Sequence, residues 1–425
     1  MRPSTHVVAL IAAVVLLQHA AIVRAQGTPA PGTVPPGVGD LFDARQLQTI
    51  RLVINPRDWA ALKADFLSNT YYPAHLVWRD QMVKNVGIRS RGTGSRSGTK
   101  PGLRVDFNLY DGAQHFHGLK SVVLRNNVQD PSHLHERLGM QLFTALGLAA
   151  PREAHARLYV NDEYAGLYSL VESIDKVFLA DRYQQDDGYL YEYDYDADDH
   201  PYYFEYKGTD PSLYSPKPFK PVTHEIDPDP RPIAELIRAV AETSAADFNR
   251  VVGRHLDLDT FVTQAAVETF LADIDGLLGD WGMNTFYLYR FEGTSRATLI
   301  PWDKSEAFKG GVARGIWQNI DDVPRPQQNR LMTRAMENPA LRALYLDVLL
   351  RCADIVSARA PAGTEASGWL EREIRFAYEQ VRVAALEDTA TPFSNDAFEE
   401  DVRRLITFAR ERSDVVREAV RQSQR

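Results

Sequence analysis

Asp275-Gly-Leu-Leu-Gly-Asp280-Trp-Gly-Met-Asn284 is the stretch that decides the interpretation of this chain. Two alternating strands, predicted at 285–291 and 297–301, follow it as a hairpin, and Pro301-Trp302-Asp303 comes directly after them. In phosphoryl transfer a loop Asp meets the acceptor hydroxyl, while an Asn and a later Asp bind metal. Mg²⁺ keeps several waters, so a few side-chain oxygens suffice to hold it. The stretch therefore predicts metal chemistry, although Asp and Asn in glycine-rich loops are also common turn formers.

The length of the chain predicts how many lobes it has, and its net charge argues against one class of partner. At 425 residues the chain exceeds a single small core, which predicts two lobes or domains. The chain has 57 acidic and 48 basic residues, for a net charge of −9. Non-specific nucleic-acid binding depends on neutralising phosphates, so we expect no nucleic-acid partner. The oligomeric state is left open.

The N-terminus has the pattern of an export signal. Arg2 precedes an apolar run over 7–17, and Ala25 offers a cleavage site, so residues 1–25 are predicted to be a signal peptide. Residues 26–40 are rich in Gly and Pro and are predicted to be a flexible linker. No later stretch is as apolar and long as a transmembrane helix. We therefore expect a secreted or periplasmic protein.

The remaining chain divides by its periodicity. Alternating patterns dominate 41–172, with one prominent helix that begins at Asp130 or Ser132 and ends at Gly147. Helical patterns dominate 173–425, apart from an acidic, Tyr-rich region, a proline-rich region at 208–232 and the hairpin region 275–308. The predicted class is α+β, with a β-rich first lobe at 41–172 and a mainly helical second lobe at 173–425.

Two other segments could contact an anionic ligand. The loop 89–100 is dense in Gly, Ser and cations, including Arg91 and Lys100, and successive backbone N–H groups in such loops can bind anions. A solvated surface loop is the alternative. Glu172 stands at the end of a strand that connects the β-rich half to the helical half. A two-lobed nucleotide enzyme would hold the adenine against such a connection. The alternative is that Glu172 forms a structural ion pair.

Other chemistries receive less support. His115 and His117 form one closely spaced pair and His133 and His135 another, and neither pair predicts a metal cluster. The chain has a single cysteine, Cys352, and lacks a Gly-x-Ser-x-Gly elbow. A carboxylate pair for glycoside hydrolysis stays open because acids are plentiful.

Several blocks of sequence, taken together and in order, resemble the CotH kinase family (spore-coat protein H-like), an atypical branch of the protein-kinase-like fold. These blocks are Val86-Gly-Ile-Arg-Ser-Arg-Gly-Thr-Gly-Ser95 with Lys100, Phe116-His-Gly-Leu-Lys120, Leu124-Arg-Asn-Asn127, Asp130-Pro-Ser-His-Leu-His-Glu136-Arg137, Tyr159-Val-Asn-Asp-Glu-Tyr-Ala-Gly-Leu-Tyr168, Glu172-Ser-Ile-Asp175, Asn284-Thr-Phe-Tyr-Leu-Tyr289 and Pro301-Trp-Asp303. The matching text covers about 86–308, with a continuation to Arg412.

The resemblance implies a two-lobed kinase-like fold and Mg²⁺-dependent transfer from ATP to Ser or Thr of a protein acceptor, with Mn²⁺ as an alternative metal. It implies that Lys100, with Lys120 as its rival, neutralises nucleotide phosphates, and that Glu136 holds that lysine. Arg91 and Glu172 are the further nucleotide contacts.

The same resemblance implies that Asp275 is the loop aspartate near the acceptor hydroxyl, with Asp280 as its rival, and that Asn284 and Asp303 bind the metal. One departure stands out. The family reads Trp-Asp-x-Asp, whereas Ser305 takes the place of the second acid here and Glu306 follows one position on. A nucleotide-binding pseudokinase, or an extracellular binding or structural module, is therefore the alternative.

Overall fold

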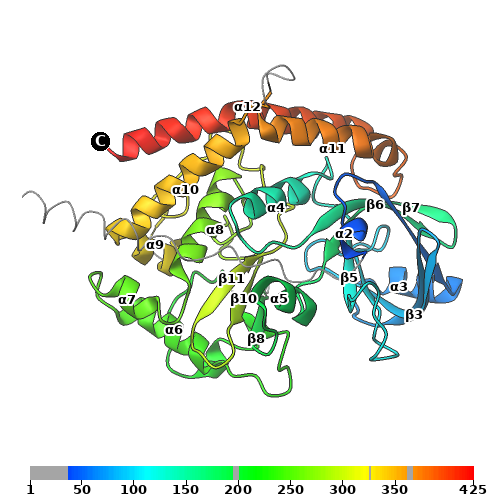
Figure 1. Ribbon diagram of the computed structural model, residues 1–425, viewed down its shortest axis with the longest axis horizontal. Helices are drawn as coiled ribbons and strands as arrows, with labels where there is room; N and C mark the ends of the chain where they lie inside the picture. Colours follow the sequence, from blue (N-terminus) through cyan, green and yellow to red (C-terminus); the bar gives the residue numbers. More distant parts are fainter. Residues whose placement is uncertain (1–36, 195–200, 325–326, 361–366) are drawn as a thin grey trace, which may run out of the picture.

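The computed structural model describes residues 37–194, 201–324, 327–360 and 367–425 (Figure 1). The predicted signal peptide and the linker as far as residue 36 lie outside these residues. The end of the predicted linker is wrong, because α2 (Val38–Leu41) is helical and Val38 is fully buried. No helix in the described parts of the chain combines the length and the hydropathy needed to cross a membrane.

The first part of the chain forms a closed barrel of seven strands. Its members are β1 (Gln48–Ile54), β2 (Tyr72–Trp78), β3 (Gln81–Ser90), β4 (Leu103–Asp106), β5 (Ser121–Arg125), β6 (Glu153–Val160) and β7 (Glu163–Glu172). Their order is β1-β2-β3-β4-β5-β7-β6, and a parallel β1–β6 pair closes the ring. Apolar side chains from alternate positions fill the interior. Closure leaves no open sheet edge in this ring.

Two helices accompany the barrel, α3 (Pro56–Ala64) and α4 (His135–Ala145). Helix α4 follows β5 and begins later than predicted, at His135, and Gly147 beyond its end has a φ of +84°. Asp130 and Ser132 lie in the turn before the helix, and they accept hydrogen bonds from its start: the N–H of His135 donates to Oδ2 of Asp130 over 2.8 Å, and the N–H of Leu134 donates to Oγ of Ser132 over 3.3 Å. The start of α4 therefore faces the end of β5.

The second part is mainly helical and contains a four-stranded sheet of order β11-β10-β8-β9. The strands are β8 (Tyr189–Tyr193), β9 (Phe219–Pro221), β10 (Phe286–Arg290) and β11 (Ala297–Pro301). The helices are α5 (Lys176–Tyr183), α6 (Arg231–Glu242), α7 (Phe248–Val252), α8 (Leu258–Phe270), α9 (Arg330–Met336), α10 (Pro339–Ser357), α11 (Trp369–Leu386) and α12 (Asn395–Ser423), with a 3₁₀ turn at Pro211–Leu213.

The register of the predicted hairpin positions the candidate residues. Phe286 pairs with Pro301, so the residues just before β10 and just after β11 emerge at the same end of the hairpin. Asn284 stands two positions before the first residue of β10, and Asp303 stands two positions after the last residue of β11. The hairpin was predicted correctly, whereas β8 lies in the Tyr-rich region and was not predicted as a strand.

Helices α11 and α12 extend along one side of the molecule, over α10 and toward the barrel (Figure 1). Helix α11 contacts both α4 and β7, so the C-terminal helices touch the elements that carry the first half of the site. The mixed helix and sheet content agrees with the predicted α+β class, and the division into two lobes at residue 172 stays a prediction.

Candidate functional site

Arg125, the last residue of β5, is the centre of a polar cluster built from three elements. Its Nε lies 2.9 Å from Oε2 of Glu136 in the first turn of α4, and its Nη1 lies 2.6 Å from Oδ2 of Asp303 after β11. A carboxylate in the first turn of a helix is favoured by the helix dipole. Arg125 stands in the block Leu124-Arg-Asn-Asn127, but the sequence analysis gave it no role in the site. The available signal was a lone arginine at the end of a mostly apolar strand.

Asp303 is held in a defined orientation. Ser305 donates a hydrogen bond from Oγ to Oδ1 of Asp303 over 2.9 Å, while Arg125 occupies Oδ2. Burial alone would raise the pKa of Asp303, but the Arg125 guanidinium holds it below its usual value. Asp303 is therefore an anion at the edge of the cluster, with a quarter of its side chain exposed.

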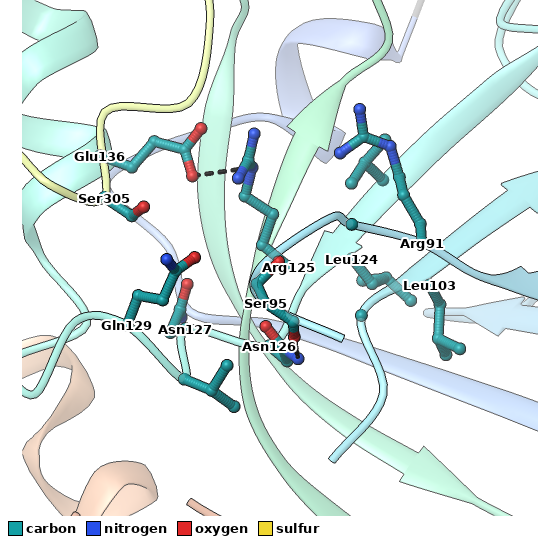
Figure 2. A pocket seen from close by; sticks show the side chains of 14 residues that line it. Arg91, Ser95, Leu103, Leu124, Arg125, Asn126, Asn127, Gln129, Glu136 and Ser305 are labelled. Carbon is teal, nitrogen blue, oxygen red and sulfur yellow. Dashed lines mark hydrogen bonds and ion pairs between the residues drawn. The ribbon is translucent and has the colours of Figure 1, made fainter. Parts of the chain in front are cut away.

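The predicted glycine-rich loop and the Arg125 cluster share one pocket (Figure 2). Its walls come from the loop, from β5 and the residues after it, from α4 and from the segment after β11; the lining includes Arg91, Gly92, Ser95, Gly102, Leu103, Val123, Arg125, Asn126, Asn127, Gln129, Glu136 and Ser305. Asn126 fastens the loop to β5, because its Nδ2 donates to the carbonyls of Ser95 (2.8 Å) and Lys100 (2.7 Å). The loop is therefore a wall of the pocket rather than a free surface loop.

Asp275 and Asn284 meet beside this cluster. Asn284 donates from Nδ2 to Oδ1 of Asp275 over 3.0 Å, and its backbone N–H donates to Gly276. Burial raises the pKa of Asp275 to about 7, against the hydrogen bond from Asn284, which lowers it. Asp280, the rival, is engaged elsewhere: Arg314 and Asn319 both donate to its carboxylate. The structure thus brings Asp275, and not Asp280, to Asn284.

Lys304 is a buried residue that binds both ends of this loop, and the sequence analysis did not identify it as part of the site. Its fully buried Nζ donates to Glu268 (2.8 Å), Asp273 (3.1 Å) and Oγ1 of Thr285 (2.9 Å). A buried ammonium needs such partners because desolvation is costly. The network ties the end of α8, the loop and the residue next to Asp303 together.

The predicted pair of Lys100 with Glu136 is wrong. Lys100 is fully buried, and its Nζ donates to Asp388 over 2.6 Å and to the carbonyl of Leu167 over 2.9 Å. Strand β5, which ends in Arg125, faces the start of α4, whereas Lys100 lies in the loop before β4. The cation that reaches Glu136 is therefore Arg125 and not Lys100. Lys120 precedes β5 and is absent from the described residues that line the pocket.

Of the two other residues predicted to contact the nucleotide, Arg91 lines the pocket and Glu172 does not. Arg91 lines the pocket, lies over the ring of Trp302 at 4.9 Å and approaches Glu192 at 3.4 Å. Glu172 is buried, and its carboxylate is bound by Arg152 and, over 3.0 Å, by Arg182. A buried carboxylate with two arginine partners is not free to bind a ligand, so the structural ion pair describes Glu172 and the nucleotide contact was wrong.

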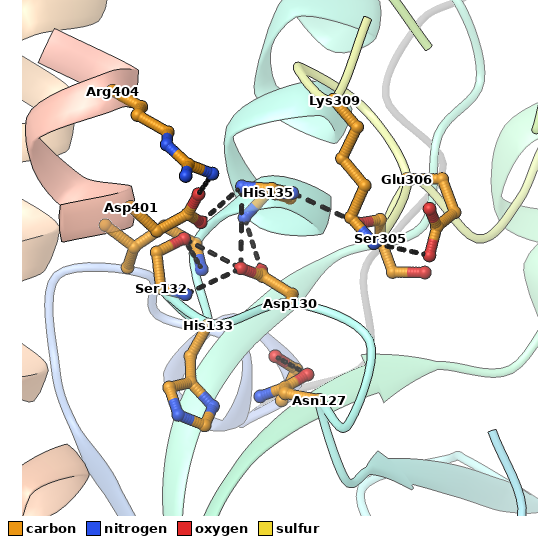
Figure 3. Close-up of polar contacts among 12 residues, drawn as sticks. Asn127, Asp130, Ser132, His133, His135, Ser305, Glu306, Lys309, Asp401 and Arg404 are labelled. Atoms are coloured by element: carbon orange, nitrogen blue, oxygen red, sulfur yellow. Dashed lines mark hydrogen bonds and ion pairs between the residues drawn. The ribbon is translucent and has the colours of Figure 1, made fainter. Parts of the chain in front are cut away.

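A second polar cluster lies on the other side of Ser305 (Figure 3). Nε2 of His135 lies 2.9 Å from Asp401 and 3.6 Å from Asp130, and Nδ1 lies 3.1 Å from the carbonyl of Ser305. Burial opposes a charged imidazole, but the two carboxylates raise the pKa of His135 to about 9. The three ligand atoms lie within 4.8 Å of one another, close enough for a metal. A charged His135 already forms ion pairs with both carboxylates, so this cluster does not need a metal. The histidine spacing could not indicate the cluster in the sequence, because Asp401 lies far from His135 along the chain.

The residues of the pocket suit a phosphate group and a divalent metal. Nη2 of Arg125, Nδ2 of Asn127 and both carboxylate oxygens of Glu136 are buried without an aligned hydrogen bond among the described residues. Buried polar atoms of this kind are rare without a ligand or water. The open donors match phosphate oxygens, and the carboxylates match a metal that prefers oxygen ligands.

The sequence of this chain is similar to known proteins of one family. A family model described as CotH kinase protein matches residues 88–416, well over half of the chain. The inner spore coat protein H of Bacillus subtilis (strain 168) is 24% identical over 372 residues, which cover 88% of this chain and 97% of that protein. Among solved structures, the Helicobacter pylori proinflammatory kinase CtkA covers 76% of this chain and 95% of its own, at 10% identity and a TM-score of 0.30.

Proposed function

Because the chain belongs to the CotH kinase family, we propose that it transfers the γ-phosphoryl group of ATP to Ser or Thr hydroxyls of a protein acceptor, with Mg²⁺ as the metal and Mn²⁺ as an alternative. The observation that carries the proposal is the ion-pair bridge from Arg125 to both Glu136 and Asp303. A cation fixed by two carboxylates beside a glycine-rich loop is an arrangement that positions phosphates.

Each residue has a role in this proposal. Arg125, oriented by Glu136, donates to phosphate oxygens, and the planar guanidinium can do so in a bidentate manner. The backbone of the loop from Arg91 to Ser95 covers the phosphates. Asn284 and Asp303 hold the metal, which when bound offsets the charge of the phosphate oxygens.

Asp275 is the residue proposed to accept the proton of the acceptor hydroxyl. A general base works best when its pKa lies near the working pH, and the pKa of Asp275 is raised to about 7 by burial. The hydrogen bond from Asn284 orients the carboxylate, and Lys304 fixes the loop that carries it.

The decisive experiment is incubation of the full chain with ATP and Mg²⁺, followed by intact-mass analysis of the chain and of candidate acceptors. Mass increments of one phosphate on Ser or Thr, lost in an Asp303→Asn variant, are expected. If no acceptor gains phosphate and ATP causes no thermal shift, the proposal fails.

The second candidate is a nucleotide-binding protein without phosphoryl transfer. Ser305 favours it, because a hydroxyl donates to Asp303 at the position where the family has a second acid. This candidate requires a thermal shift with ATP that does not depend on Mg²⁺, since binding to the folded state alone raises stability. An Asp303→Asn variant that matches the parent in every assay would support it.

We also propose that the chain is exported and cleaved after Ala25. The apolar run and the cleavage pattern of the first 25 residues support this. N-terminal sequencing of the mature protein from its native source, starting at Gln26, is the expected result, and an intact N-terminus would exclude it.

A further inference from the structure

Trp302 is a buried aromatic residue that contacts two arginines of the phosphate pocket. It follows β11 directly and is 5% exposed, and it is not among the described residues that line the pocket. Cζ of Arg91 lies 4.9 Å from the centroid of its indole ring, and Cζ of Arg125 lies 4.7 Å from the same ring. Both distances end on one ring, so the two guanidiniums are neighbours, and both line the pocket (Figure 2).

Two neighbouring cations repel each other, so their proximity needs stabilising partners. The face of an aromatic ring attracts a guanidinium, and an indole does so most strongly. Carboxylates add to this attraction: Glu192 lies 3.4 Å from Nη2 of Arg91, while Glu136 and Asp303 bind Arg125. Each of these carboxylates forms an ion pair with one arginine, whereas the indole contacts both.

The second sheet holds the indole in place. The Trp302 ring packs edge-on against the ring of Tyr287 in β10, with the centroids 5.6 Å apart, and its backbone N–H donates to Thr285 over 3.2 Å. The hydroxyl of Tyr287 donates to Glu192 in β8 over 3.1 Å, and Glu192 is the carboxylate that pairs with Arg91. A closed ring of contacts therefore runs from the indole through the sheet to Arg91 and back to the indole.

The two guanidiniums reach the pocket from different parts of the barrel. Arg91 belongs to the loop after β3, and Arg125 is the last residue of β5. A planar guanidinium binds phosphate oxygens in a bidentate manner. A chain of adjacent phosphates presents oxygens to two such groups at once, whereas a single phosphate gains less from the second.

We propose that Trp302 is a positioning residue that holds Arg91 and Arg125 as a pair, and that the pair binds adjacent phosphates of one polyphosphate chain in preference to a single phosphate. This rests on the proposed function, because it takes the pocket to be the phosphate site, but it requires no transfer step. The indole touches the arginines and not the ligand.

The first measurement compares two inorganic ligands. The full chain is titrated calorimetrically with tripolyphosphate and with inorganic phosphate, in the presence of Mg²⁺ and without nucleoside or acceptor. We expect tripolyphosphate to bind at least about tenfold more tightly, since two guanidiniums contribute to its binding. Equal affinities, or no binding of tripolyphosphate, would overturn the proposal.

Variants then test the role of the indole. Trp302→Leu should weaken tripolyphosphate binding by about tenfold or more, and Trp302→Phe by less, since a phenyl ring attracts a guanidinium more weakly. Trp317→Leu is the matched control, because Arg342 lies over the Trp317 ring at 4.3 Å and neither is among the described residues that line the pocket. The control should bind tripolyphosphate as the parent does. If Trp302→Leu also binds it as the parent does, Trp302 does not position the arginines.

A double-mutant cycle separates positioning from general damage to the fold. Arg91→Met should weaken tripolyphosphate binding by about tenfold in the parent but by less than about threefold in Trp302→Leu, because the arginine has already lost its position there. Losses that add in full would contradict the proposal.

Circular dichroism checks that each variant is folded. Should Trp302→Leu fail to fold, a fluorinated tryptophan in place of Trp302 keeps the shape of the indole but withdraws electron density from its face. Unchanged affinity for tripolyphosphate in that protein would equally overturn the proposal.

The outcomes separate this proposal from the proposed function. A chain that binds tripolyphosphate as expected, with the expected losses in the variants, but transfers no phosphate refutes the proposed function alone. A chain that transfers phosphate, and whose Trp302→Leu variant binds tripolyphosphate as tightly as the parent, refutes the role of Trp302 alone.

Discussion

Arg125 and Asp303 are joined over 2.6 Å although 178 positions separate them, so a barrel strand and the segment after the β10–β11 hairpin share one ion pair. Glu136 occupies the Nε side of the same guanidinium. The first position to test is therefore the guanidinium that all three elements share.

Arg125→Met should abolish ATP binding and lower the free energy of unfolding by about 3–5 kcal/mol, because it leaves Glu136 buried and unpaired. Arg125→Lys retains the charge but lacks the planar fork that reaches both carboxylates, so ATP should bind at least tenfold more weakly. Calorimetric ATP titration and urea unfolding measure the two effects. Lys120→Met is the control and should bind ATP normally; if it loses ATP and Arg125→Met does not, the assignment is reversed.

Asp275→Asn should lower the rate of phosphoryl transfer by about 10²–10⁴-fold while ATP affinity stays within threefold, because a base that contacts the acceptor affects the chemical step. Asp280→Asn should change the rate by less than about threefold, since Arg314 and Asn319 hold that carboxylate away from Asn284. Steady-state rates against acceptor and ATP concentration give both values. Equal losses in the two variants would contradict the choice of Asp275.

The ion pairs of His135 predict a dependence of stability on pH. The pKa of His135 rises from an ordinary value of 6.5 to about 9 in the folded chain, so its contribution is complete below pH 6.5 and is lost as pH rises through 9. The loss should be about 3 kcal/mol between these values, by the usual conversion of a pKa shift to free energy. Urea unfolding at pH 6 and 9.5 measures it.

His135→Gln should flatten that dependence, whereas His115→Gln, which changes an exposed histidine, should retain it. A His135→Gln variant whose stability still falls by the full amount over this range would show that another group is responsible.

Lys100→Met should destabilise the fold by about 3–5 kcal/mol, because Asp388 is left as a fully buried, unpaired carboxylate. Replacing both partners, as Lys100→Met with Asp388→Leu, should recover only part of that loss. The unpaired charge is removed, but the backbone N–H groups of Leu167, Ala390 and Thr391, which donate to Asp388, lose their acceptor. Urea unfolding of the two single variants and the double variant gives the coupling energy. ATP affinity should be unchanged in whichever variants fold; a large loss of affinity without a loss of stability would restore Lys100 as a phosphate ligand.

The sequence predicted those parts of the site that depend on local pattern. Strand alternation identified the hairpin, and the register of a hairpin brings residues such as Asn284 and Asp303 to one end, so their convergence followed without knowledge of the fold. The glycine-rich loop was found from its composition and does line the pocket.

Local sequence pattern could not show which basic residue pairs with Glu136. Which of Lys100, Lys120 and Arg125 faces Glu136 depends on strand order within the barrel and on the position where α4 begins, and both are tertiary properties. The partner of Lys100 lies 288 positions away in sequence, after α11. Strand β8 was missed because its tyrosines, which favour strands, stand among acidic residues that suggested an irregular region.

The pairing of Lys100 with Asp388 also has a consequence for the order of events during synthesis. The barrel consists of residues that leave the ribosome early, yet the only described carboxylate that neutralises its buried lysine leaves after α11 is complete. A nascent chain stopped before residue 388 would hold an uncompensated ammonium beside Leu167, in the middle of β7. The barrel is therefore expected to reach its final packing only when translation is nearly finished, and ribosome-bound intermediates should stay sensitive to protease until then.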